Sequence, residues 1–174
     1  MIVLLGCTSS SVVVNSDYDP SANFLGYQTY GWLATPREST GDPRLNSPLL
    51  DARIRNAVET QLKAKGYTKA NTGSPDILVN YHVMVRGALD IRTINDVYGY
   101  GPRHLRGWGA AGSTTHVRQV EEGTLLLDFL DPATQNLLWR GTAKGFVEPS
   151  LHPTEREKRI QDIIKRILDQ FPPK

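Results

Sequence analysis

The 174-residue chain has a single cysteine, Cys7, and no long run of apolar residues. One cysteine excludes an intramolecular disulfide framework and any metal site built from several thiolates. A helix that crosses a membrane needs about 18 to 20 consecutive apolar residues, and no stretch of the sequence approaches that length. The sequence therefore predicts neither a disulfide scaffold nor a helical membrane span.

Charge of one sign is also scarce, because 20 Lys and Arg residues face 18 Asp and Glu residues. A formal net charge of +2 argues against binding of polyanions through bulk charge, although a local basic patch stays open. The hydrophobic fraction of 39% and the charged fraction of 22% are typical of globular proteins. A chain of this length can bury one core, so we expect one folded domain.

The lone cysteine lies at an abrupt change of polarity. Residues 1–5 are apolar, Gly6 and Cys7 follow, and residues 8–11 are Thr and Ser. The run Leu4-Leu5-Gly6-Cys7 resembles the lipobox of bacterial lipoproteins. That resemblance implies cleavage before Cys7, a diacylglyceryl group on its thiol and acylation, for example by palmitate, of the new amine. Two or three acyl chains anchor a protein stably, whereas one does not.

The alternative is that residues 3–7 form a strand that buries the cysteine in the core. Signal peptides normally carry a basic start and an apolar run of about 7 to 15 residues, and both are missing here. We interpret residues 1–6 as a truncated signal-peptide remnant and residues 7–23 as the anchor cysteine and its tether. Thr8 after the cysteine implies, by resemblance to lipoprotein sorting, the periplasmic face of the outer membrane.

Two helices are predicted from apolar residues at helical spacing. The first begins at Ser47-Pro48, with Ser as N-cap and Pro at the first position, and ends at Gly66. The second begins with a capping box, Thr154 and Glu157, and carries an apolar stripe as far as Phe171. Both helices have one apolar face.

Strands are predicted from β-branched and aromatic residues and from alternation. The predicted strands span residues 12–14, 27–33, 76–85, 123–130 and 137–146, the last two forming a hairpin. Sequential hairpins with one early and one late helix favour an α+β fold in a single domain, residues 24–174. We expect a mainly antiparallel sheet with both helices packed on one face.

A set of short motifs in this order resembles a known family. The motifs are Asp19-Pro20, Phe24, Tyr27–Trp32, Leu62–Tyr67, Pro75–Tyr81, Gly123–Asp128 and Leu138–Ala143. Together they resemble the bacterial lipoprotein family catalogued as domain of unknown function 4136. The resemblance implies a location in the cell envelope and transfers no catalytic residue. From the residues alone, Trp32 and Trp139 are interpreted as core or edge fillers, and Asp128 as an outward or turn-bonding residue.

Chemistry-bearing residues are scattered. The four histidines lack metal-ligand spacing, and we expect no metal site and no cofactor. Residues 107–112 match a dinucleotide fingerprint, but no apolar strand precedes them and no helix pattern follows. The sequence favours a protein that is not an enzyme. A less favoured alternative is a hydrolase-type enzyme with polar residues converging around His82 and Asp128.

The most unusual segment is a predicted Gly/Arg/aromatic loop at about residues 86–118, with five arginines against two aspartates. Its candidate contact residues are Arg92, Tyr98, Tyr100, Arg103, Arg106 and Trp108. Arginine and aromatic side chains suit anions and interfaces, so the loop is a candidate surface for an envelope protein, glycan or lipid. Nucleic acid is not an expected partner of an exported protein. The alternatives are an inert glycine-rich excursion and an envelope protein without a dedicated ligand.

Overall fold

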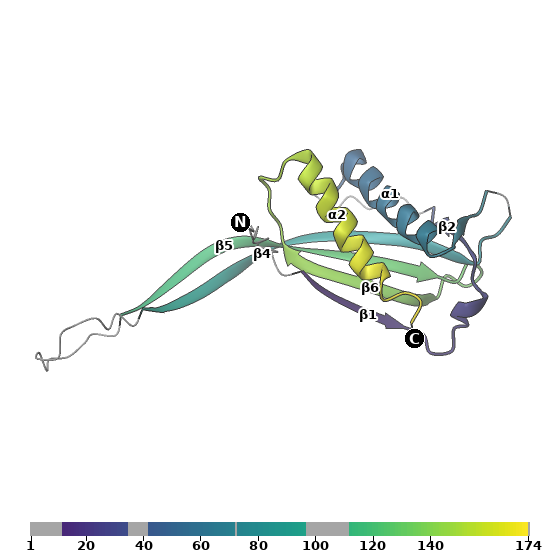
Figure 1. Ribbon diagram of the computed structural model, residues 1–174, viewed down its shortest axis with the longest axis horizontal. Coiled ribbons are helices and arrows are strands. Elements are labelled where there is room, and N and C mark those ends of the chain that lie inside the picture. Colours follow the sequence, from purple (N-terminus) through teal and green to yellow (C-terminus); the bar gives the residue numbers. More distant parts are fainter. Residues whose placement is uncertain (1–11, 35–41, 72, 97–111, 174) are drawn as a thin grey trace, which may run out of the picture.

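The computed structural model describes residues 12–34, 42–71, 73–96 and 112–173, and within residues 90–117 it describes the strand backbone alone. Six strands form one sheet: β1 (Val13–Tyr18), β2 (Thr29–Trp32), β3 (Thr68–Lys69), β4 (Ile77–Asp96), β5 (Gly112–Leu130) and β6 (Leu137–Phe146). Their order is β1-β6-β5-β4-β2-β3. Figure 1 shows α1 (Pro48–Ala64) and α2 (Pro153–Leu168) together on one face of this sheet.

Most neighbouring strands are antiparallel, as predicted. β1 pairs with β6, β6 with β5 and β5 with β4 in antiparallel register. β2 is the exception, because it runs parallel to both β3 and β4. The α+β prediction, with two helices on one face, is therefore confirmed. The sheet is mixed at the end that holds β2 and β3.

The core lies between the helices and alternate residues of the strands. The fully buried side chains come from both layers: Val58, Leu62, Val79, Leu127, Phe129, Trp139, Ile164, Ile167 and Leu168. Beyond the end of α2, Phe171 sits at the centre of an aromatic cluster, with ring centroids 4.4 Å from Phe129 and 5.2 Å from Trp139. The apolar residues that recur at regular spacing in the sequence thus form the face that each helix or strand buries.

The first helix begins and ends as predicted, and the second does not. Pro48 opens α1, and Gly66 follows its end at a φ of 91°, which glycine adopts without strain. α2 begins at Pro153, and the backbone N–H of His152 donates to Glu155 at 3.0 Å. The predicted box of Thr154 and Glu157 was therefore wrong by two residues. Pro153, with its fixed φ and missing N–H, suits the first position of the helix.

The predicted loop at residues 86–118 was also wrong in its bounds. β4 and β5 continue their antiparallel pairing from Arg86 opposite Glu122 to Asp96 opposite Gly112. The paired segments 86–96 and 112–122, here called the arm, project beyond the helices in Figure 1. β-branched residues on both segments favour extension, which the abundance of glycine and arginine obscured.

The two tryptophans are fillers, as predicted, whereas Asp128 is not a solvated charge. Trp139 is fully buried; Trp32 is partly buried at the β2 edge, where its Nε1 donates to Glu59 at 2.8 Å. Asp128 is only 4% exposed and accepts two hydrogen bonds from Arg140, at 2.6 and 2.7 Å. Its neighbours Leu127 and Phe129 face the core, so Asp128 lies on the opposite face, where Arg140 pairs with it.

Asp76 fastens β2 to the start of β4. Its carboxylate accepts hydrogen bonds from the backbone N–H groups of Gln28 and Thr29, at 3.0 and 2.7 Å, and from the Thr29 hydroxyl at 2.7 Å. These bonds hold the pKa of Asp76 below its ordinary value, with the Thr29 hydroxyl as the largest cause. The carboxylate thus serves strand pairing.

α2 approaches the sheet closely at Gly141. A Cβ atom at this position would collide with the side chains of Ile167 on α2 and of Trp139. We predict that Gly141→Ala destabilises the domain by roughly 1 to 3 kcal/mol because the buried neighbours must shift. The measurement is urea unfolding, with Gly87→Ala as control, since a Cβ there meets nothing within 4 Å. Equal stability of the two variants would contradict the close packing.

Acid stability should depend on Asp76. A carboxylate whose pKa is lowered on folding stabilises the fold above its ordinary pKa, and that contribution is lost as the pH falls through the lowered value. We predict that Asp76→Asn loses stability at neutral pH and that this deficit shrinks as the pH falls below about 4, the ordinary pKa of an aspartate. Urea unfolding across this range checks it, with the exposed Asp162→Asn as control. A pH-independent deficit would contradict the prediction.

Candidate functional site

Both helices bury their side chains unevenly along their length. On α2, Ile164 and Ile167 are fully buried, whereas Ile160 and Ile163, nearer the start of the helix, are partly buried. On α1, Leu62 is fully buried and Leu50, in the first turn, is partly buried. Each helix therefore packs most tightly toward its C-terminal end and leaves space near its beginning.

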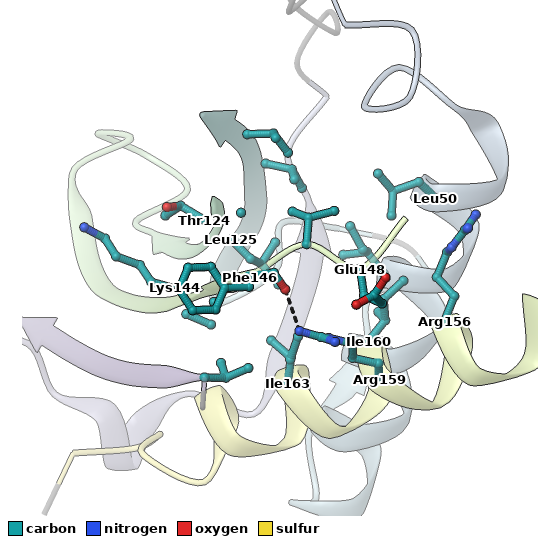
Figure 2. Close-up of a pocket in the computed structure, with 18 of the residues that line it drawn as sticks. Leu50, Thr124, Leu125, Lys144, Phe146, Glu148, Arg156, Arg159, Ile160 and Ile163 are labelled. Atoms are coloured by element: carbon teal, nitrogen blue, oxygen red, sulfur yellow. Dashed lines mark hydrogen bonds between the residues drawn. The ribbon is translucent and has the colours of Figure 1, made fainter. Parts of the chain in front are cut away.

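That space is a pocket of about 230 Å³ between the two helices and the sheet (Figure 2). Aliphatic side chains line it from three directions: Leu50 and Ile54 of α1, Ile160 and Ile163 of α2, and Val83 and Leu125 of the sheet. The pocket lies where the arm leaves the body of the sheet, because Val85 and Gly123 also contribute to its wall. The lining favours an apolar ligand.

Two glycines let further walls approach the strands. A Cβ at Gly145 would lie 3.0 Å from Cγ2 of Val12, and a Cβ at Gly123 would lie 3.0 Å from Cγ2 of Val147. Val12 and Val147 both line the pocket. Glycine at these two positions therefore shapes the pocket by permitting close approach of the segments before β1 and after β6.

Two arginines of α2 lie at the rim. Arg159 donates to the carbonyl of Phe146 at 2.6 Å, and Figure 2 shows it beside Ile160 and Ile163. Arg156 donates to the carbonyls of Pro149 and Leu151 at 3.4 and 3.2 Å. These acceptors are neutral, so they orient the two guanidinium groups without cancelling their charge.

One carboxylate, Glu148, shares the rim. It accepts a hydrogen bond from the Ser150 hydroxyl at 2.6 Å, and this bond lowers the pKa of Glu148, with Arg118 and Arg159 adding a smaller effect. Glu148 is thus ionised at neutral pH. Two guanidinium groups against one carboxylate leave the described rim with an excess of positive charge.

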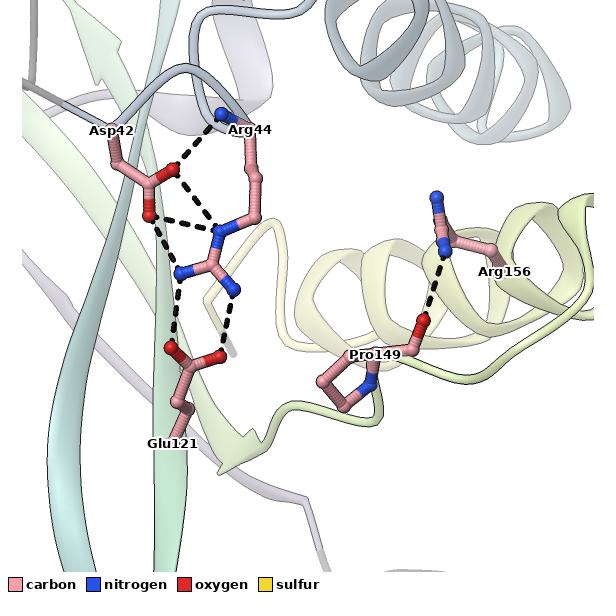
Figure 3. Close-up of polar contacts among 5 residues, drawn as sticks. All are labelled: Asp42, Arg44, Glu121, Pro149 and Arg156. Atoms are coloured by element: carbon pink, nitrogen blue, oxygen red, sulfur yellow. Dashed lines mark hydrogen bonds and ion pairs between the residues drawn. The ribbon is translucent and has the colours of Figure 1, made fainter.

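A second hollow of about 480 Å³ adjoins the pocket and shares Leu50, Val85 and Arg156 with it. Its arginine, Arg44, is compensated: it pairs with Asp42 at 2.7 Å and with Glu121 at 2.8 Å. Figure 3 shows the contrast, with Arg44 between two carboxylates and Arg156 bonded to a backbone carbonyl. On the α2 side of the rim, by contrast, Arg156 and Arg159 donate to backbone carbonyls.

The alternative site around His82 and Asp128 lies elsewhere. Neither residue lines the pocket or the adjoining hollow. His82 is exposed and shares a 3.0 Å hydrogen bond with Asn80, and Asp128 is paired with Arg140. Within the described residues, no group of three or more His, Cys, Asp or Glu side chains is placed to hold a metal ion.

Most residues singled out from the sequence lie outside the described residues: Cys7, Tyr98, Tyr100, Arg103, Arg106 and Trp108. Arg92 lies on β4, and its backbone is opposite that of His116 on β5. Their proposed roles in anchoring and partner contact stay predictions. Sequence reasoning missed the pocket because Ile160 and Ile163 belong to the same apolar stripe as the buried Ile164 and Ile167, and periodicity does not grade burial along a stripe.

The fold and site define a two-layer α+β domain with an apolar pocket at one end and arginines at its rim. The sequence of this domain matches the family described as domain of unknown function DUF4136 over residues 14–173, and the chain belongs to that family. No curated protein matches it. In the described residues, no helix is long and apolar enough to cross a membrane.

Comparison with solved structures finds similarity at low sequence identity. A PDZ domain protein from Parabacteroides distasonis ATCC 8503 superposes with a TM-score of 0.55 at 13% identity, over 95% of this chain and 37% of that one. The chain thus spans little more than a third of that protein. Two crystal forms of a PelC dodecamer from Paraburkholderia phytofirmans give TM-scores of 0.49 and 0.47 at 11% and 10% identity, over 91% of this chain and 95% of theirs.

If the pocket admits apolar ligands, a neutral fluorescent probe should bind in it. We predict saturable enhancement of N-phenylnaphthylamine fluorescence, abolished by Ile163→Trp, which fills the pocket from α2, and by Val85→Phe, which fills it from β4. The control is Leu25→Trp, because Leu25 is 92% exposed and does not line the pocket. Unchanged binding in both filled variants, with unfolding curves showing them folded, would place the probe elsewhere.

Proposed function

We propose that this chain is a lipid-anchored binding module of the bacterial cell envelope and not an enzyme. The observation that carries the proposal is the apolar pocket with arginines on its rim. Apolar pockets with a few convergent polar groups are the usual form of a small-molecule site. The pocket supports a binding role for the domain.

The anchor is supported by the sequence before the domain. Leu4-Leu5-Gly6-Cys7 resembles a lipobox, and acylation gives the single thiol of the chain a role. Val12, which lines the pocket, follows Cys7 by five residues. Five residues span at most roughly 18 Å when fully extended. An anchor at Cys7 would therefore hold the pocket close to the membrane surface, which is the periplasmic face of the outer membrane in this proposal.

The non-enzymatic part of the proposal is supported by the kind of groups at the pocket. Its lining is mainly aliphatic, and its polar members are Arg156, Arg159, Lys144, Thr124 and Glu148, whose carboxylate is bonded to Ser150. General acid-base catalysis needs a group whose pKa lies near the working pH. Arginine stays protonated and the pKa of Glu148 is lowered, so the two arginines and Glu148 suit binding and orientation.

The anchor is tested by removing the thiol. With the chain placed behind an intact lipoprotein signal peptide, we predict that wild type fractionates with the outer membrane and that Cys7→Ala is released as soluble periplasmic protein. Membrane fractionation and intact mass of the purified proteins are the measurements, with Ser9→Ala as control. An unmodified Cys7 in mature wild-type protein would overturn the anchoring proposal and leave the pocket experiment unaffected.

A further inference from the structure

We infer that the pocket takes the acyl chain of a single-chain anionic amphiphile, with the carboxylate of a fatty acid held at Arg156 and Arg159. This inference rests on the proposed binding function and names its ligand class. Three features of the site carry it: the size and lining of the pocket, the charge of its rim and its distance from the anchor.

The pocket suits one aliphatic chain. Its volume of about 230 Å³ falls below the roughly 300 to 1,000 Å³ of sites for drug-sized molecules. Its walls are made by the side chains of Leu, Ile and Val from both helices and the sheet. A polar ligand would lose hydrogen bonds to water there, whereas each methylene of an acyl chain gains about 0.8 kcal/mol by burial.

The rim selects the head group. Arg156 and Arg159 extend from α2 beside Ile160 and Ile163, and their acceptors are backbone carbonyls (Figure 2). A guanidinium has five N–H donors, so the carbonyl bonds leave further donors available for a carboxylate, which guanidinium groups bind in a fork-like geometry. Glu148 offsets one of the two charges, and a net positive rim remains to attract an anion and repel a cation.

The position of the pocket near the predicted anchor favours a ligand that comes from a membrane. Val12 forms part of the wall and lies within roughly 18 Å of Cys7 along the chain. A domain anchored through that residue is held beside a bilayer, where amphiphiles are concentrated. Charge complementarity and this short tether together favour a membrane-derived amphiphile over a water-soluble apolar metabolite.

The test compares three probes with the same ten-carbon chain: decanoate, decanol and decyltrimethylammonium. The full chain is used with Cys7→Ala, so that no acyl group of its own enters the pocket, and calorimetric titration is done below the micelle concentration. We expect one decanoate bound per chain, several-fold more tightly than decyltrimethylammonium, with decanol between them. Ile163→Trp should abolish decanoate binding and Leu25→Trp should not.

Charge variants then isolate the head-group contact. Arg159→Gln should weaken decanoate binding about five-fold, as expected for a solvent-accessible ion pair, and leave decanol binding unchanged. Arg159→Lys should restore most of the preference for the anion. Lys158→Gln removes the same charge from the neighbouring exposed residue of α2 and should change affinity less than two-fold.

Two results would overturn the inference. Equal affinity for decanoate and decyltrimethylammonium, with no effect of Arg159→Gln, would show a pocket without preference for an anion, and the proposed binding function would stand. Decanoate binding that survives Ile163→Trp would show a different site. Failure of all three probes and of N-phenylnaphthylamine would instead remove the proposed function itself.

Discussion

The packing of Ile167 against Gly141 sets how the second helix lies on the sheet. Because residue 141 has no side chain, α2 approaches β6 there more closely than any other residue would allow. Phe171, just beyond the helix, is locked among Phe129 and Trp139 on the same side. The C-terminal end of α2 is thereby fixed on the sheet, whereas Ile160 and Ile163, in the middle of the helix, are only partly buried. The pocket lies beside these two residues, between the helices and the sheet.

The same end of the domain is where the two longest strands leave the sheet. β4 and β5 continue as the arm, where they pair with each other, and the pairing of β5 with β6 ends at Glu122. A two-stranded ribbon has marginal stability alone, and its base is secured by Arg44, which links Asp42 before α1 to Glu121 on β5. The charge of Arg44 is therefore compensated by two carboxylates. Arg156 and Arg159 bond to backbone carbonyls, and Glu148 offsets one of their two charges.

The sequence predicted those features that depend on local pattern. Pro48 and Gly66 bound the first helix because each residue has a backbone restriction or freedom of its own, and the alternation of residues 77–85 belongs to a strand buried on one face. The sequence did not predict features in which residues distant in the chain determine the environment of a side chain. Asp128 does point outward as interpreted, but its burial depends on Arg140 of the next strand, which compensates its charge. The role of Asp76 depends in the same way on donors from β2, 47 and 48 residues away. The pocket depends on graded burial along two helices, which no single stripe encodes.

The start of β1 and the residue before it are bonded to α2 and to the residues that follow α2. Arg166 donates to the carbonyl of Val12 at 2.7 Å, and Gln170 donates to the carbonyl of Val14 at 3.4 Å, so the outer edge of β1 is covered by the helix that also forms the pocket. Val12 is simultaneously a pocket wall and lies against Gly145. An anchor at Cys7 would therefore act through a tether of five residues on a point fixed to α2. The opening of the pocket would then stay near the bilayer however the arm is oriented, because the restraint is attached to the wall of the pocket and not to the far side of the domain.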